Sequence, residues 1–121
     1  MTTVLVVDDS GMLREMVADL LQKNGMTVIQ ACDGVDAQEK IEVQLPDLVV
    51  TDLIMPRMNG YDLCRWIKGN PASEKVPVIV CSTKSEEFDR YWGMKQGADA
   101  YISKPFAQEE LLETVKQLLR K

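Results

Sequence analysis

The feature that most constrains the fold of this chain is a regular alternation of two kinds of segment. Short runs of apolar, mostly β-branched residues indicate buried strands, and longer stretches with helical periodicity follow them. The expected strands span residues 4–7, 27–31, 47–51, 76–81 and 100–103. Buried strands that alternate with helices are typical of a parallel sheet with helices on both faces. We therefore expect a doubly wound α/β sandwich of five parallel strands, in the order 2-1-3-4-5, and five helices.

Each expected helix presents apolar residues to the sheet at a period of 3.6 residues. The residues expected to face inward are Met12, Leu13, Met16, Val17, Leu20 and Leu21 in the first helix, Ala37 and Ile41 in the second, Gly60, Leu63, Cys64 and Ile67 in the third, and Leu111, Leu112, Val115, Leu118 and Leu119 in the fifth. The fourth helix, near residues 86–96, carries Phe88 and the adjacent pair Tyr91 and Trp92. We expect one of that pair in the core, because adjacent helix positions point in different directions.

Composition excludes several kinds of chemistry. The chain has no His, so it can form neither a Ser-His-Asp triad nor a His-ligated metal site. With 14 Lys and Arg against 19 Asp and Glu, the net charge of −5 argues against a general binder of nucleic acid or anionic membranes. The apolar runs are too short to span a membrane, and we expect a cytoplasmic protein. Cys32, Cys64 and Cys81 match no metal or disulfide spacing and are expected to be small buried side chains.

Polar residues stand at the carboxyl ends of the expected strands. They are Asp8 and Asp9 after the first strand, Asp52 after the third, Ser82 after the fourth and Lys104 after the fifth. In an open α/β sheet, ligands bind beyond the carboxyl ends of the strands, at the point where the strand order reverses. The first and third strands flank that point, so the three Asp side chains should share one shallow cleft.

These side chains favour metal-assisted phosphoryl chemistry. Three neighbouring carboxylates repel one another without a cation, and hard oxygen ligands suit Mg²⁺. A carboxylate can attack phosphorus to give an aspartyl phosphate. Mg²⁺ and the ammonium of Lys104 would neutralise the oxygens of the transferring phosphoryl group. The sequence therefore predicts Mg²⁺-assisted phosphoryl transfer to an Asp.

Five segments together resemble the receiver domain of two-component response regulators. They are VVDDS at 6–10, DLVVTD at 47–52, MPRMNG at 55–60, PVIVCS at 77–82 and GADAYISKPF at 97–106. The resemblance covers essentially the whole chain. It implies the flavodoxin-like (βα)5 fold of CheY-type receivers and a single receiver domain over residues 1–121, with no output domain.

The resemblance implies a role for each residue of the site. Asp52 would be the phosphoacceptor. Asp9, Asp52 and the backbone carbonyl of Ile54 would bind Mg²⁺, and Asp8 would act through a coordinated water. Lys104 would contact the phosphate, and its peptide bond to the following proline is typically cis in the family.

The resemblance also implies a switch. Ser82 would supply the switch hydroxyl, and Tyr101 the aromatic ring that turns inward when the hydroxyl follows the phosphoryl group. Thr83 stands where a small residue is usual and is the alternative hydroxyl, although Ser82 has the family spacing to Lys104. The readout face would comprise the fourth helix, the fifth strand and the fifth helix.

Partners follow from the same resemblance. A histidine kinase of the CheA type would donate the phosphoryl group, since the chain has no His of its own. A downstream protein would bind the readout face of a monomer or weak dimer. Residues 82–84 and 89–98 are similar to the stand-alone PilH-type receivers of type IV pilus and phototaxis systems, which implies a motility pathway. Whether the protein drives an output or serves as a phosphate sink for a competing receiver stays open.

Readings from other classes fit less well. A Mg²⁺-dependent phosphatase that passes through aspartyl phosphate would need a second acid two residues after Asp52, where Ile54 stands. A flavodoxin-like cofactor binder would need a phosphate cradle where Asp8 and Asp9 would repel the FMN phosphate. A pseudo-receiver that only binds partners would not need the complete set of site residues. We therefore expect a switch rather than an enzyme that turns over a separate substrate.

Two residues are expected to tune the lifetime of the aspartyl phosphate. Ile54 has no hydrogen-bonding group and would cover the approach of a hydrolytic water. Lys84 cannot accept a proton from that water while it is charged. Both residues predict slow self-dephosphorylation, and the alternative is that Ile54 packs locally and Lys84 is solvated.

Overall fold

Strands and helices alternate along the computed structural model, which describes residues 2–83 and 87–120. The strands are β1 (Thr3–Val7), β2 (Thr27–Ala31), β3 (Leu48–Asp52), β4 (Val78–Ser82) and β5 (Ala100–Ser103). The helices are α1 (Gly11–Lys23), α2 (Gly34–Val43), α3 (Gly60–Gly69), α4 (Glu87–Lys95) and α5 (Gln108–Leu119). Every expected strand and helix is present, with small shifts at the ends. Among the described residues, no helix is long and apolar enough to cross a membrane.

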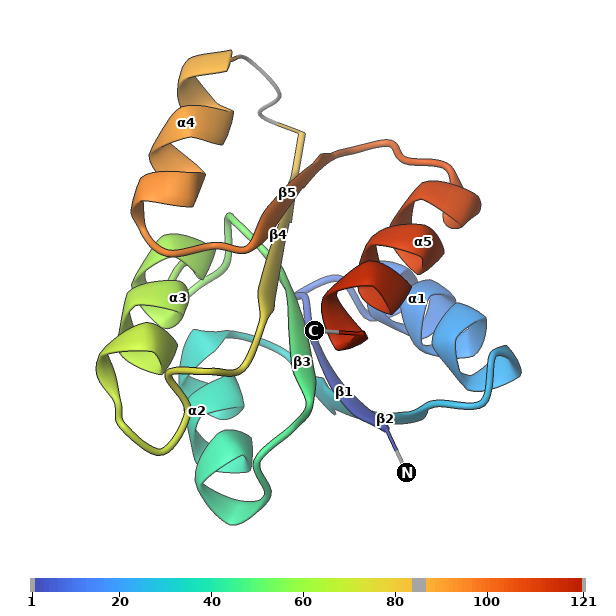
Figure 1. Ribbon diagram of the computed structural model, residues 1–121, viewed down its shortest axis with the longest axis horizontal. Coiled ribbons are helices and arrows are strands. Elements are labelled where there is room, and N and C mark those ends of the chain that lie inside the picture. The colour runs from blue at the N-terminus through green and yellow to red at the C-terminus, as the bar shows by residue number, and fades with distance from the viewer. Residues whose placement is uncertain (1, 84–86, 121) are drawn as a thin grey trace.

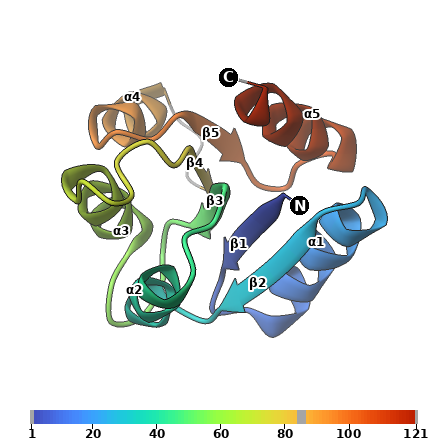
Figure 2. The ribbon, with the colours of Figure 1, turned by 60° about the horizontal axis from the view of Figure 1, so that its bottom comes forward.

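All strands of the sheet run parallel, in the order β2-β1-β3-β4-β5. Helices α1 and α5 cover one face, and α2, α3 and α4 cover the other (Figure 1, Figure 2). The expected doubly wound topology is therefore confirmed. The order reverses between β1 and β3, so the carboxyl ends of these two strands lie next to each other at the edge where ligands bind in such folds.

The core has two halves, because successive strand residues point to opposite faces of the sheet. On the side of α2, α3 and α4, Leu5 and Val49 pack in one cluster with Leu63. On the side of α1 and α5, Val6 packs in a second cluster with Leu111. The inward residues expected for α2, α3 and α5 lie in or against these clusters. Strand β2 is less buried, because it lies at the edge of the sheet.

The inward face expected for α1 is partly wrong. Val17 and Leu21 are buried as expected, and Ala18 is buried with them. Met12 and Met16, however, are 82% and 44% exposed. The apolar stripe of α1 is wider than the strip covered by the sheet and α5, so its two methionines remain at the surface.

The expectation that Tyr91 or Trp92 lies in the core is also wrong, because both are exposed. The buried face of α4 is centred on Gly93, which packs against the ring of Tyr101. The two aromatic residues precede Gly93 and lie outside the buried face of the helix. The side chain of Phe88 lies outside the described residues.

Two of the three cysteines are small buried side chains, as expected. Burial raises the pKa of Cys64 to about 11 and that of Cys81 to about 12, so both thiols stay protonated at neutral pH. Cys32 is exposed, which contradicts the expectation. It lies directly after the last residue of the edge strand β2, in the loop before α2.

Candidate functional site

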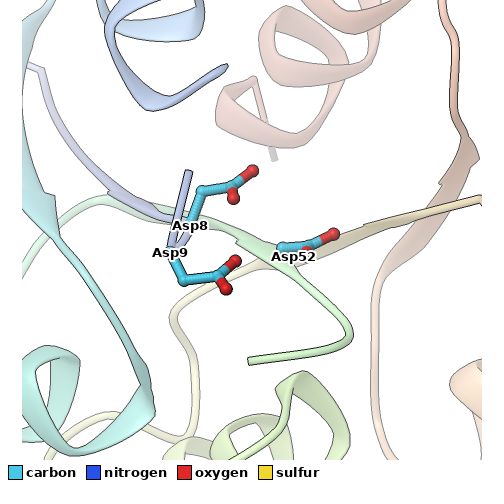
Figure 3. Close-up of side chains that lie close together, drawn as sticks. All are labelled: Asp8, Asp9 and Asp52. Carbon is cyan, nitrogen blue, oxygen red and sulfur yellow. The ribbon is translucent and has the colours of Figure 1, made fainter. Parts of the chain in front are cut away.

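The register of the sheet brings two acids together. Val7 of β1 pairs with Thr51 of β3, so the next residues, Asp8 and Asp52, emerge side by side at the carboxyl edge. Asp9 follows in the same loop, and the three side chains converge there (Figure 3). One carboxylate oxygen from each of the three acids lies within 4.8 Å of the other two. This geometry is a cluster of hard oxygen donors of the kind that holds a divalent cation.

Lys104, the residue directly after β5, places its ammonium in the same cluster. The Nζ atom of Lys104 donates to Asp8 Oδ2 at 3.1 Å and to Asp52 Oδ1 at 3.0 Å. The side chains of all three residues are mostly buried. The backbone N–H of Lys104 donates to the carbonyl of Ser82 at 2.7 Å, and the next peptide bond, to Pro105, is cis as expected. Lys104 is thus fixed at both its backbone and its ammonium.

The electrostatics of the site favour a further positive charge. Burial raises the pKa of Asp52, an effect that the hydrogen bond from Lys104 opposes and the charge of Asp8 reinforces. Burial lowers the pKa of Lys104, but its hydrogen bonds and ion pairs with Asp52 and Asp8 outweigh this effect, and the pKa lies above its usual range. A single ammonium is therefore shared by two buried carboxylates, with Asp9 beside them. This excess of negative charge matches the acidic donor set of a Mg²⁺ site.

Contacts from α1 and its N-cap hold Asp8, and one of them could not be predicted from the sequence. The backbone N–H of Ser10, the N-cap of α1, donates to Asp8 Oδ1 at 2.9 Å. Arg14 donates from Nη1 to the carbonyl of Asp8 at 2.8 Å and from Nε to Gln30 Oε1 at 3.0 Å. Arg14 therefore fixes the backbone at the acidic loop and ties it to β2. No sequence pattern marks this role, which depends on how α1 packs against β2.

Gly60 is a second residue whose role at the site could not be inferred from its place in the apolar stripe of α3. A Cβ atom at this position would lie 2.4 Å from the backbone carbonyl oxygen of Asp52. Its N–H donates to the carbonyl of Leu53 at 2.7 Å. The first residue of α3 thus packs directly on the backbone of Asp52, which requires glycine.

The remaining predicted residues surround this cluster at different depths. Ser82 is buried at the end of β4, and Thr83 is exposed beyond it. Tyr101 is buried in β5, and Ile54 is 58% exposed in the loop after Asp52. Lys84 lies outside the described residues. The structure therefore brings Asp8, Asp9, Asp52 and Lys104 into direct proximity. It places Ser82 and Tyr101 on adjoining strands and Ile54 in the loop after β3.

The response regulator receiver domain is the family whose model matches residues 4–116 of this chain. The match covers most of the sequence, and the acidic cluster and the sheet order agree with it. The chain belongs to this family of receiver domains, which are signalling modules of two-component and chemotaxis-type systems.

Three proteins show which kinds of receiver this chain resembles. Protein PilG of Pseudomonas aeruginosa is 44% identical over 113 residues, which are 93% of this chain and 84% of that protein. Protein PilH of the same organism is 35% identical over 119 residues, 98% of each chain. The crystal structure of the chemotaxis protein CheY4 of Vibrio cholerae superposes with a TM-score of 0.91 at 31% identity, covering 98% of both chains. The first two relatives agree with the PilH-type resemblance seen in the sequence.

Other curated relatives are longer proteins. Response regulators that are 36% to 41% identical to this chain match it along only about half of their own length, 48% to 50%. The shared part is the receiver domain.

Proposed function

We propose that Asp52 accepts a phosphoryl group from a histidine kinase of the CheA type, and that this phosphorylation switches the contacts of the protein with a downstream partner. The observation that supports this most directly is the ammonium of Lys104, which donates to both Asp8 and Asp52 inside the acidic cluster. An ammonium in this position can contact a phosphoryl group carried on Asp52 while Asp8 still neutralises part of its charge.

The transfer forms one bond and breaks another. A carboxylate oxygen of Asp52 attacks the phosphorus of the phosphohistidine, and the phosphorus–nitrogen bond breaks as the imidazole leaves. Lys104 binds an equatorial oxygen of the transferring group. The negative charge of this oxygen then replaces the Asp52 carboxylate as the partner of the Lys104 ammonium. Because Gly60 has no side chain, the backbone of Asp52 can keep its position during the attack.

The acidic cluster fits Mg²⁺, since its donors are hard oxygens with excess negative charge. Asp9, Asp52 and the backbone carbonyl of Ile54 would bind the metal directly, and Asp8 would bind through a water. When bound, Mg²⁺ would neutralise negative charge on the phosphoryl oxygens, as the ammonium of Lys104 does.

Phosphorylation would shift an existing equilibrium between two conformations. Ser82 would follow the phosphoryl group, and Tyr101 would report its movement to the face formed by α4, β5 and α5. Similarity to PilG, PilH and a chemotaxis protein supports a pathway of pilus motility or chemotaxis type. The protein would act in the cytoplasm. The protein would act as a single receiver domain with no enzymatic turnover of its own.

The test is incubation with acetyl phosphate and Mg²⁺, followed by mass spectrometry of the intact protein. We expect the mass of one added phosphoryl group, which hydroxylamine removes. Asp52→Asn should abolish labelling. Asp47→Asn, at the opposite end of β3, is the matched control and should be labelled like the wild type. Labelling of Asp52→Asn at the wild-type rate would contradict the proposal.

A competition experiment separates an output from a phosphate sink. The phosphorylated kinase is mixed with this protein and with a second receiver of the same cell. A sink drains the phosphoryl group from the second receiver and gains no partner. An output protein binds a target more tightly when phosphorylated, and Ser82→Ala should weaken that gain without preventing phosphorylation.

A further inference from the structure

The loop that follows Asp52 is pinned at its base. Residues 53–59 connect β3 to α3, and the N–H of Gly60 donates back to the carbonyl of Leu53 at 2.7 Å. The loop therefore leaves and returns at the backbone of Asp52. Its conformation decides where the backbone carbonyl and the side chain of Ile54 lie relative to the phosphoacceptor.

The tip of this loop holds an unusual backbone conformation. Arg57 has a φ of 66°, and the N–H of Met58 donates to the carbonyl of Pro56 at 2.7 Å across it. A tight turn with positive φ at its centre is rare and strained for a residue other than glycine. Such a conformation persists when surrounding contacts fix it.

An ion pair supplies the fixing contact. Arg57 donates from Nε to Asp33 Oδ2 at 2.7 Å and from Nη2 to Asp33 Oδ1 at 3.0 Å. This two-point contact between guanidinium and carboxylate sets both distance and orientation. The ion pair made by the Arg57 side chain therefore compensates the strain in the Arg57 backbone.

Asp33 is itself firmly held. Its carboxylate accepts from the N–H of Asp36 at 2.8 Å as the N-cap of α2, and its side chain is only 7% exposed. The next residue, Gly34, packs on Met58, where a Cβ atom would lie 2.6 Å from the Met58 Cβ atom. Two consecutive contacts thus dock the loop before α2 against the loop before α3.

We propose that Asp33 and Arg57 are positioning residues, whose ion pair holds the loop after Asp52 in the conformation that binds Mg²⁺ and takes up the phosphoryl group. This inference rests on the proposed function and deepens it. Neither residue touches the acidic cluster. The pair acts through the backbone of residues 53–59, and its loss lets the strained turn relax and move the carbonyl of Ile54.

Two single variants separate the ion pair from other roles of the same residues. Asp33→Asn keeps a side-chain acceptor that can cap α2 but loses the charge. Arg57→Met keeps a long side chain at the strained positive φ but loses the guanidinium. A matched control is Arg65→Gln, which removes the exposed ion pair with Asp62 on α3 and leaves the loop untouched.

The first measurement is Mg²⁺ affinity by calorimetry with no phosphodonor present. We expect each single variant to bind Mg²⁺ about 10-fold more weakly than the wild type, at the lower end of the losses known for residues that orient metal ligands. The double variant should be no weaker than either single variant, because both remove the same interaction. Arg65→Gln should bind like the wild type.

The second measurement is the rate of labelling by acetyl phosphate as a function of Mg²⁺ concentration. Positioning predicts a higher half-saturating concentration with a plateau rate close to that of the wild type, whereas general destabilisation lowers the plateau. Variants within twofold of the wild type in both affinity and half-saturation would overturn the inference.

The wild type separates this inference from the proposed function. A wild-type protein that binds Mg²⁺ but takes no phosphoryl group would overturn the proposed function, and the calorimetric comparison would still decide the role of the ion pair. A wild-type protein that binds no Mg²⁺ would overturn both.

Discussion

The ring of Tyr101 lies so close to Gly93 that a Cβ atom on residue 93 would stand 2.7 Å from its Cδ2 atom and 3.1 Å from its Cε2 atom. Arg90 places its guanidinium 5.9 Å from the centre of the same ring and donates to Ser103 Oγ at 2.9 Å. The buried position of Tyr101 therefore depends on a missing side chain in α4. A residue that would report phosphorylation is held by a helix of the proposed readout face.

Gly93→Ala should destabilise the protein and turn Tyr101 outward. Atoms closer than van der Waals contact must move, and an overpacked site of this kind costs about 1–3 kcal/mol in the free energy of unfolding. Urea denaturation measures the loss, and the NMR signals of the Tyr101 ring report its movement.

Two matched variants show whether the clash is the cause. Gly69 is also a helical glycine, and a Cβ atom added there would meet no described atom within 4 Å beyond its own stretch of helix. Gly69→Ala should therefore be neutral, or raise the free energy of unfolding by up to about 1 kcal/mol. Gly93→Ala in a Tyr101→Ala background should behave in the same way. An equal loss of stability with and without the Tyr101 ring would contradict the prediction.

Asp52→Asn should stabilise the protein when Mg²⁺ is absent. The variant removes a buried carboxylate whose pKa is raised by burial and by the charge of Asp8, while Lys104 keeps Asp8 as its partner. We expect a gain on the order of 1 kcal/mol in the free energy of unfolding. Chemical denaturation in the presence of a chelator measures it.

Added Mg²⁺ should reverse that order. A ligand at 100 times its dissociation constant stabilises the folded protein by about 2.7 kcal/mol, and the wild type should gain more than the variant. Sodium chloride at matched ionic strength controls for screening. If the wild type is the more stable protein in chelator, the site does not carry the charge imbalance described here.

Ile54→Asn should shorten the life of the aspartyl phosphate. Ile54 is exposed beside Asp52, and an amide at that position can orient the water that attacks the phosphorus. We expect decay to accelerate from a few-fold to tens-fold, about 1–2 kcal/mol of barrier. Loss of the phosphorylated mass in excess Mg²⁺ measures the rate.

Ile54→Leu keeps an apolar side chain and should decay like the wild type. Combining Ile54→Asn with Lys84→Glu, which adds a proton acceptor, should accelerate decay further. Decay that is no faster in either asparagine variant would mean that water access is controlled by other residues.

Tyr61 should ionise later than a free tyrosine. Burial, and then the neighbouring Tyr101, raise the pKa of Tyr61 to about 12, and its hydroxyl donates to the carbonyl of Asp89 at 3.1 Å. Because the folded pKa lies above the unfolded value of 10.0, the protonated phenol stabilises the fold below pH 10.0 and this contribution disappears as the pH rises toward 12. Ultraviolet titration of phenolate should show a late step that Tyr61→Phe removes.

The corresponding stability difference has a fixed sign. At neutral pH, the free energy of unfolding of Tyr61→Phe should be about 1 kcal/mol lower than that of the wild type, since the variant loses a hydrogen bond between α3 and α4. The gap should narrow above pH 10.0. A gap that widens with rising pH would contradict the assignment.

The fold and the centre of the site could be predicted because both depend on local patterns. The period of apolar residues distinguished strands from helices, and the topology of a parallel sheet then placed Asp8, Asp52 and Lys104 at one edge. The roles of the individual residues came instead from resemblance to receiver domains. The direct contacts of Lys104 with the two acids agree with that resemblance.

The rest depended on tertiary packing that no local pattern records. The exposure of Tyr91 and Trp92 is set by the approach of α4 to Tyr101, and that of Met12 by the width of the surface that covers α1. The ion pair between Asp33 and Arg57 joins loops 24 residues apart in the sequence. Neither residue lies in a pattern of apolar or site residues that points to the other.

Because Asp8 and Asp52 share the ammonium of Lys104, the acidic site is complete only when the fold is complete. Lys104 lies 96 residues from Asp8 and 52 residues from Asp52 in the sequence. During synthesis the acids leave the ribosome first, and the lysine that bridges them arrives with β5, at the far edge of the sheet. Until that strand pairs with β4, the acids repel one another without their internal counter-ion. A nascent or partly unfolded chain would therefore lack the assembled acidic site, and under the proposed function a kinase would act only on molecules that have finished folding.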